Sequence, residues 1–270
     1  MKTRIISGAC YVVIIAGCFL LREFVDFRLF NLLLWFFATL GTLEVAEAVN
    51  KYTTKKALIV AGVFGGLSVP AFCLIEHFFA GWGFIAPIAL SVISGVILFV
   101  LTKRKSKRIF CLLPAFYPSL LILTSLMINY LQGVGFIATL TLFVIAPLAD
   151  SFAYFLGTLI GGKKLCPKLS PKKTWAGAFG SVLGGAMGGL AVYFVFGSSL
   201  NVRLGYVLFA IIGVVASVLT IFGDLFASLI KRKVGIKDYG NIMPGHGGVM
   251  DRIDGMIFSS PLILVAFSLI

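Results

Sequence analysis

The chain has 270 residues, of which 60% are hydrophobic and only 12% are charged. Its mean hydropathy of +1.06 excludes a soluble globule, in which the apolar share is nearer half. The net charge of +13 favours anionic partners such as lipid headgroups and nucleotides. It does not favour nucleic acid, because the cations lie in short loops between apolar runs and no recognition module is visible.

The apolar residues form nine runs of roughly 16 to 27 residues, and about 20 residues cross a bilayer as a helix. We therefore expect an all-α polytopic membrane protein with about nine transmembrane helices. The expected spans are 5–21, 29–50, 57–74, 80–101, 109–131, 134–157, 176–197, 204–230 and 255–270. The first follows Lys2 and Arg4 as in a signal peptide. No small-residue cleavage site precedes Arg22, so we expect this run to remain as a helix.

The distribution of cations predicts the topology. Twenty of the 23 Lys and Arg residues lie before the first run or in the second, fourth, sixth and eighth loops. Cytoplasmic segments of membrane proteins carry this excess, so the N-terminus is expected in the cytoplasm and the C-terminus outside. The short loops suit a multi-pass protein of a plasma membrane.

Unusual polar residues are concentrated in the second half of the chain. Residues 1–131 read as a scaffold of transmembrane helices. Residues 132–270 read as a catalytic half with cytoplasmic loops at 158–175 and 231–254, each too short to build a core of its own. The five cysteines are scattered without metal or disulfide spacing. The glycines at 177, 180, 184, 185, 188 and 189 are expected to serve close helix packing.

The segment from Ser228 to Gly255 concentrates charge around a glycine-rich turn. It contains Lys231, Arg232, Lys233, Lys237, Asp238, Gly245, His246, Gly247, Gly248, Asp251, Arg252 and Asp254. Interleaved cations and carboxylates suit a polyphosphate with its divalent metal, and glycines let backbone N–H groups approach phosphate oxygens. A solvated basic loop that only obeys membrane topology would explain the lysines, but not the three acids and the Gly-His-Gly-Gly turn.

The earlier long loop contains Ser170-Pro171-Lys172-Lys173-Thr174 just before a glycine-rich span. Lys172, Lys173 and the hydroxyls of Ser170 and Thr174 could contact phosphates near the start of that helix. The alternative is a basic loop followed by an ordinary helix-start signal.

Ionisable residues within membrane spans are costly and indicate function. Asp150, Asp224, Asp251 and Asp254 are expected at similar depth near the cytoplasmic side, where a bound Mg²⁺ would relieve their mutual repulsion. Salt bridges to Lys231, Arg232 or Arg252 are the alternative. At i and i+3 on a helix, Asp251 and Asp254 share a face, and Arg252 points elsewhere. Glu44 and Glu47 are weaker candidates, because they lie near the inner end of the second span.

His246 is flanked by glycines and is therefore presented by a turn, not packed on an apolar face. It could donate to a phosphate, act as a general acid or cap the turn. We favour the phosphate contact.

The whole pattern resembles that of the phosphatidate cytidylyltransferases (CDP-diacylglycerol synthases). The residues that carry the resemblance are Ser228-x-x-Lys231-Arg232-x4-Lys237-Asp238-x5-Pro244-Gly245-His246-Gly247-Gly248-x-x-Asp251-Arg252-x-Asp254-Gly255, together with Asp150-x-x-Ala153-Tyr154-x-x-Gly157, Ser170-Pro171-Lys172-Lys173-Thr174 and Gly223-Asp224-Leu225. These motifs cover residues 150 to 255. Ala176 departs from the pattern, because members of this family often have an acid there.

The resemblance implies an Mg²⁺-dependent nucleotidyltransferase that makes CDP-diacylglycerol and pyrophosphate from CTP and phosphatidic acid. It implies metal ligands at Asp224 and Asp251, then Asp254 and Asp150, and leaves room for a second cation. Catalytic residues would include Lys231, Arg232, Lys237, Asp238, His246 and Arg252. The nucleotide would also contact Ser170, Lys172, Lys173, Thr174, Gly245, Gly247 and Gly248. A homodimer is implied as well.

Two other functions remain open. A membrane kinase of lipid alcohols would also use CTP but would release CDP. A cation-coupled transporter would place buried acids nearer the midplane of the membrane, and no inverted repeat of the kind that many transporters carry is visible. The CDP-alcohol phosphotransferases are disfavoured, because their paired-aspartate pattern is absent.

Overall fold

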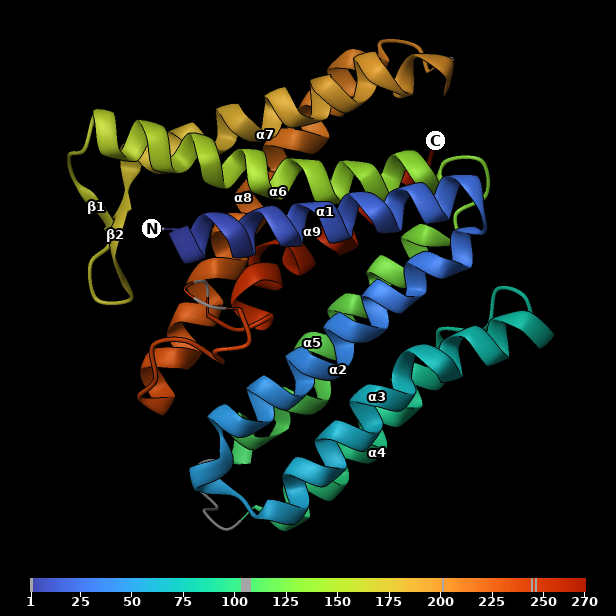
Figure 1. Ribbon diagram of the computed structural model, residues 1–270, viewed down its shortest axis with the longest axis vertical. Coiled ribbons are helices and arrows are strands. Elements are labelled where there is room, and N and C mark those ends of the chain that lie inside the picture. The colour runs from blue at the N-terminus through green and yellow to red at the C-terminus, as the bar shows by residue number, and fades with distance from the viewer. Residues whose placement is uncertain (1, 103–107, 201, 244, 246) are drawn as a thin grey trace. The chain divides into compact units, whose positions relative to one another are not determined.

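A computed structural model describes residues 2–102, 108–200, 202–243, 245 and 247–270, and it is built almost entirely of helices (Figure 1). Nine α-helices lie within the described residues. They are α1 (Lys2–Phe24), α2 (Phe30–Ala48), α3 (Lys55–Phe78), α4 (Ile85–Leu101), α5 (Arg108–Asn129), α6 (Gly135–Leu159), α7 (Trp175–Val195), α8 (Gly205–Val234) and α9 (Met250–Ser268). The expected all-α polytopic membrane protein is thereby confirmed.

Seven of these helices are long and apolar enough to cross a membrane. Of the other two, α4 is apolar but has only 17 residues. Helix α9 has 19 residues and carries Asp251, Arg252 and Asp254 near its start. The orientation of the termini stays a prediction.

The chain forms two compact units. The first comprises residues 1–127 and 233–253, and the second comprises residues 128–232 and 254–270. Residues 233–253, which the sequence analysis assigned to the C-terminal half, therefore pack with the N-terminal helices.

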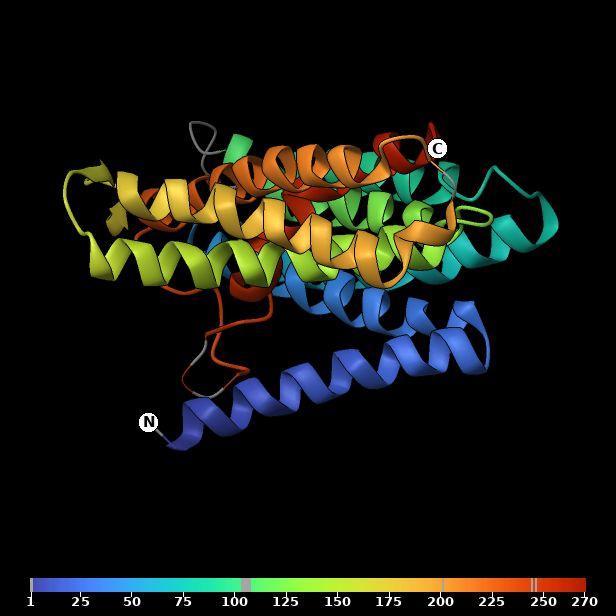
Figure 2. The same ribbon diagram turned by 90° about the horizontal axis from the view of Figure 1, so that it is seen from above.

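In the first unit, α2, α3 and α4 pack in series (Figure 1). The α2–α3 contact is close, because a Cβ at Gly65 would lie 2.8 Å from the Thr42 side chain. The Trp35 indole donates to the Gly66 carbonyl oxygen at 2.8 Å across the same pair. Helix α1 leaves α2 at an angle in both views (Figures 1 and 2), and side chains such as Val13 are exposed, as expected of a helix that faces lipid.

In the second unit, glycines bring α7 against two neighbours. A Cβ at Gly180 would lie 2.5 Å from the Phe152 carbonyl oxygen of α6, and one at Gly184 would lie 2.6 Å from that of Leu148. On another side of α7, a Cβ at Gly185 or Gly189 would overlap the backbone of α8. The prediction that these glycines serve helix packing is confirmed, because the backbones meet where side chains would separate them.

Two expected loops differ from the structure. Residues 158–175 contain an antiparallel hairpin of β1 (Lys164–Cys166) and β2 (Ser170–Thr174), which projects from the ends of α6 and α7 (Figure 1). The loop expected at 231–254 is shorter. Helix α8 continues to Val234 because Lys231, Arg232 and Lys233 are good helix formers, and the first residue past its end is Gly235, at a φ of +78°.

The packing of α7 on α6 gives a first prediction. We expect Gly184→Ala to lower the free energy of unfolding by about 1–3 kcal/mol, because the added methyl group must displace backbone. Unfolding in mixed micelles, followed by circular dichroism, measures this change. The control is Gly17→Ala in α1, where an added Cβ meets nothing within 4 Å. An equal loss in both variants would contradict the close approach of α7 and α6.

Candidate functional site: carboxylates and their partners

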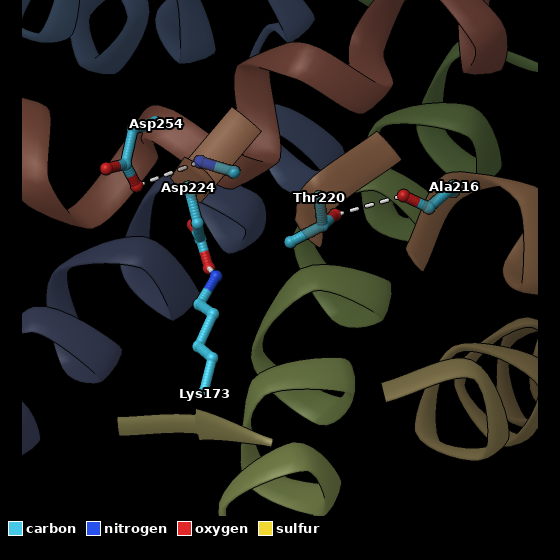
Figure 3. Close-up of polar contacts among 6 residues, drawn as sticks. Lys173, Ala216, Thr220, Asp224 and Asp254 are labelled. Atoms are coloured by element: carbon cyan, nitrogen blue, oxygen red, sulfur yellow. Dashed lines mark hydrogen bonds and ion pairs between the residues drawn. The ribbon is translucent and has the colours of Figure 1, made fainter. Parts of the chain in front are cut away.

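The hairpin presents one lysine to an aspartate of the membrane-embedded helices. Residues of a strand alternate between its faces, so Lys172 is exposed and Lys173 is half-buried. The Lys173 ammonium donates to Asp224 Oδ2 of α8 at 2.6 Å (Figure 3). Both side chains are less than one third exposed, so this charge pair is only partly screened by solvent. Both residues were predicted at the site, but their pairing was not.

Thr174 ends the hairpin and begins α7. Its hydroxyl oxygen accepts the Gly177 N–H at 3.0 Å, which is an N-cap, and the residue is only 5% exposed. A Cβ at Gly157 of α6 would lie 3.2 Å from the same oxygen. Thr174 therefore fixes the junction from which β2 presents Lys173. Ser170 lies at the other end of β2 and is half-buried.

Asp224 and Asp254 lie near each other where α8 and α9 cross. A Cβ at Gly255 would lie 2.7 Å from Asp224 Oδ1, and one at Gly223 would lie 2.6 Å from the Asp254 carbonyl oxygen. Asp254 is 7% exposed, and its Oδ1 accepts the Gly255 N–H at 2.9 Å. Figure 3 shows the Asp224 side chain reaching toward Lys173, and a dashed line marks the hydrogen bond that the Asp254 carboxylate accepts. The crossing is close only because both helices have glycine there.

Asp251 is held by backbone from the loop between α8 and α9. Its Oδ2 accepts the N–H of Tyr239 at 2.8 Å and that of Gly248 at 3.0 Å. Within the loop, Met243 N donates to Gly247 O at 2.9 Å, and Gly247 has a φ of +85° that favours glycine. The loop thus wraps around the Asp251 carboxylate. Pro244 and His246 lie outside the described residues, so the predicted phosphate contact of His246 stays a prediction.

Glu44 of α2 has the larger role that the sequence analysis did not assign to it. Its Oε1 accepts the Val249 N–H at 2.9 Å, and its Oε2 accepts the Met250 N–H at 2.8 Å. Glu44 is 6% exposed. A sequence signal existed, because Phe37, Gly41 and Glu44 repeat at i, i+4 and i+7 on one buried face of α2. Glu47, one turn later, is exposed and accepts from Asn50.

The other predicted residues lie in four places. Lys231 and Arg232 are on the last turns of α8 and not in a loop, and Arg252 is exposed on the first turn of α9. Lys237, Asp238 and Gly245 are exposed on the loop between α8 and α9, whereas Gly248 is buried. Asp150 is exposed on α6.

The donor chemistry fits a hard divalent cation. Asp224 and Asp254 supply carboxylate oxygens at one helix crossing, and Asp224 accepts a cationic group there in the form of the Lys173 ammonium. Among the described residues, no group of three or more His, Cys, Asp or Glu side chains is close enough to hold a metal. A metal held by two carboxylates would need further oxygen ligands, and Mg²⁺ usually keeps several waters.

The fold is that of a polytopic membrane protein, with a lysine–carboxylate pair in one compact unit and a carboxylate-binding, glycine-rich loop in the other. A model of the cytidylyltransferase family matches residues 2–270. The chain belongs to this family, and the predicted family is confirmed.

Several curated relatives carry the name phosphatidate cytidylyltransferase. That of Thermotoga maritima is 27% identical over 276 residues, which cover 100% of this chain and 97% of the relative. That of Helicobacter pylori is 31% identical over 96% of this chain and 89% of the relative. That of Brucella abortus is 34% identical over 64% of this chain, and this match spans 62% of the relative's length, which is less than two thirds.

The cap at Thr174 gives a second prediction. We expect Thr174→Ala to lower the free energy of unfolding by about 1 kcal/mol, because the Gly177 N–H loses its acceptor. Thr174→Ser keeps the hydroxyl oxygen and should retain most of the stability, as measured by chemical unfolding in micelles. Equal losses in the two variants would show that the methyl group, and not the cap, matters.

Proposed function

We propose that the protein transfers the cytidylyl group of CTP to phosphatidic acid, giving CDP-diacylglycerol and pyrophosphate for phospholipid synthesis. The observation that carries this proposal is the Lys173–Asp224 pair beside Asp254, in a chain whose family match runs over residues 2–270. It brings a phosphate-binding type of side chain next to metal-binding ones. The relatives' printed names support the same transfer.

The metal would be Mg²⁺, held by Asp224 and Asp254, with Asp251 one turn earlier on α9 and with Asp150. When bound, this ion would supply positive charge to the phosphates of the nucleotide. A second cation is compatible with the proposal. The support is that Asp224 and Asp254 both lie at the crossing of α8 and α9, and that carboxylate oxygens are ligands that Mg²⁺ prefers.

The cations of the chain would neutralise the nucleotide and lipid phosphates. Lys173 lies at the Asp224 carboxylate, and Lys172 is exposed on the opposite face of β2. Arg252 is exposed on the first turn of α9, near the end of the loop that carries Lys237. The backbone N–H groups of the turn at Gly245 and Gly247 would add uncharged donors to phosphate oxygens.

The reaction needs positioning more than it needs a base. A phosphate monoester has a second pKa near ~6, so phosphatidic acid is largely a dianion at neutral pH. One of its oxygens forms a bond to the α-phosphorus of CTP while the bond from that phosphorus to the bridging oxygen of pyrophosphate breaks. Alignment of the two phosphates and neutralisation of their charge would provide most of the catalysis.

We place the protein in a plasma membrane with its site facing the cytoplasm, and we expect a homodimer. The excess of lysine and arginine in alternate loops supports this orientation. CTP is a soluble polyanion, whereas phosphatidic acid keeps its phosphate at the bilayer surface, so a site at the cytoplasmic ends of the helices can receive both.

The third prediction tests the reaction itself. Purified protein in detergent should release pyrophosphate only when CTP, Mg²⁺ and phosphatidic acid are all present. Asp224→Asn should abolish this release, because it removes a carboxylate that is proposed to hold the metal. Glu47→Gln, an exposed acid that accepts from Asn50, should retain the release. Pyrophosphate is measured by a coupled phosphate assay, and the nucleotide product by chromatography.

Other outcomes would support the alternatives. CDP without pyrophosphate would contradict cytidylyl transfer and favour a CTP-dependent lipid kinase. Ion flux in proteoliposomes without any nucleotide product would favour a cation-coupled transporter.

The fourth prediction concerns the partners of Asp224. Lys173 and a divalent cation compete for the same carboxylate, so Lys173→Ala should tighten Mg²⁺ binding to the protein alone. The same variant should raise the KM for CTP about tenfold or more, because one phosphate-neutralising charge is lost. Mg²⁺-dependent melting and steady-state kinetics measure the two effects.

Lys168→Ala is the matched control, because Lys168 is an exposed lysine of the same hairpin. It should change neither quantity. If Lys173→Ala weakened Mg²⁺ binding and CTP binding together, general disruption of the hairpin would explain the result better than competition at Asp224.

A further inference from the structure

Glu44, from a distant part of the chain, accepts from the first residue of α9 and from the residue before it. Val249 and Met250, whose N–H groups donate to its two oxygens, are both fully buried. The first N–H groups of a helix have no partner inside the helix, and a buried N–H without an acceptor is costly. A carboxylate is also the favoured charge at a helix N-terminus. Glu44 therefore determines where α9 begins.

The surrounding loop is shaped to the Glu44 carboxylate. A Cβ at either Gly240 or Gly248 would overlap its oxygens, so the loop approaches on both sides only because these residues are glycine. On the far side, a Cβ at Gly41 would lie 3.5 Å from the Met250 sulfur, which is ordinary contact. The side chain of Glu44 is thus enclosed by the loop and by the start of α9.

The same short stretch of backbone holds Asp251. The Gly248 N–H donates to Asp251 Oδ2, while the next two N–H groups along the chain donate to Glu44. The Tyr239 N–H, next to Gly240, donates to the same Asp251 oxygen. The two carboxylates therefore bind neighbouring N–H groups of one loop. A shift of the loop at Glu44 would move the N–H donors that orient Asp251.

We propose that Glu44 is a positioning residue, which sets the orientation of the Asp251 carboxylate by holding Val249, Met250 and the glycines on either side of it. The link to metal binding rests on the proposed function, in which Asp251 is a ligand. In this role Glu44 would act through the loop backbone and not by contact with the metal or the substrate. Its role resembles that of the outer-shell groups that orient metal ligands in other enzymes.

The principal test is Glu44→Gln. A glutamine keeps the shape of the side chain but has one acceptor oxygen, so one of the two buried N–H groups loses its partner. We expect backbone amide exchange in residues 248–251 to become at least tenfold faster, as measured by hydrogen–deuterium exchange. We expect kcat to fall about 10–100-fold and the Mg²⁺ concentration for half-maximal activity to rise about tenfold, while the KM for CTP changes little.

The matched control is Glu47→Gln, which makes the same chemical change one helical turn away on the exposed face of α2. It should leave exchange, kcat and the Mg²⁺ requirement at parental values. A second variant, Gly240→Ala, retains every charge and places a methyl group against the Glu44 carboxylate. It should raise the Mg²⁺ requirement in the same direction, and it keeps the test decisive if Glu44→Gln does not fold.

The outcomes separate this inference from the proposed function. Faster exchange with unchanged kcat and Mg²⁺ requirement would show that Glu44 only stabilises the loop, and it would overturn the inference. Unchanged exchange would overturn it as well. If the parent releases no pyrophosphate, the proposed function fails. The Mg²⁺-induced rise in melting temperature then decides, because a smaller rise in Glu44→Gln than in Glu47→Gln still supports the positioning of Asp251.

Discussion

A carboxylate that is removed from water must be met by a cation or by N–H donors, and the acids of each compact unit of this protein satisfy that requirement. Asp224 is met by the Lys173 ammonium. Asp251 is met by the backbone of Tyr239 and Gly248, and Glu44 by the backbone of Val249 and Met250. If a donor were removed, the carboxylate would have no partner to replace the water it lost on burial. These contacts therefore help to position the hairpin, the loop between α8 and α9, and the start of α9.

Several glycines around these carboxylates follow from the same requirement. A Cβ at Gly240 or Gly248 would overlap the Glu44 carboxylate, and one at Gly255 would lie 2.7 Å from Asp224 Oδ1, so the chain passes this close to the acids only as glycine. Their use differs from that of the α7 glycines, which bring helix against helix in an apolar setting where close packing drives association. Glycine thus serves two purposes in this protein. Beside a carboxylate it makes room for the acid, and between two apolar helices it allows close packing.

Hydrophobic runs and composition were enough to predict nine helices and the packing role of the α7 glycines, because these depend on local pattern. The family was predicted from the resemblance of the motifs between residues 150 and 255. The hairpin was not predicted, since Ser-Pro-Lys-Lys-Thr has no alternation of apolar residues to indicate a strand. The contacts of Glu44 span 205 and 206 residues of sequence, and the pairing of Lys173 with Asp224 spans 51. Which buried acid meets which donor depends on tertiary packing, which a local pattern does not determine.

Backbone N–H donors and a lysine side chain differ in how much freedom they leave to the carboxylate that they contact. A backbone N–H is fixed by the fold, so Asp251 and Glu44 keep their orientation whatever binds nearby. The Lys173 ammonium stands on a flexible four-carbon stem, so under the proposed function it would move from Asp224 to a phosphate by side-chain rotation alone. Under the proposed function, Asp251 is therefore a carboxylate of fixed geometry, whereas Asp224 is one whose partner can be exchanged. Positioning and charge neutralisation, the two demands of phosphoryl chemistry, then fall to different carboxylates.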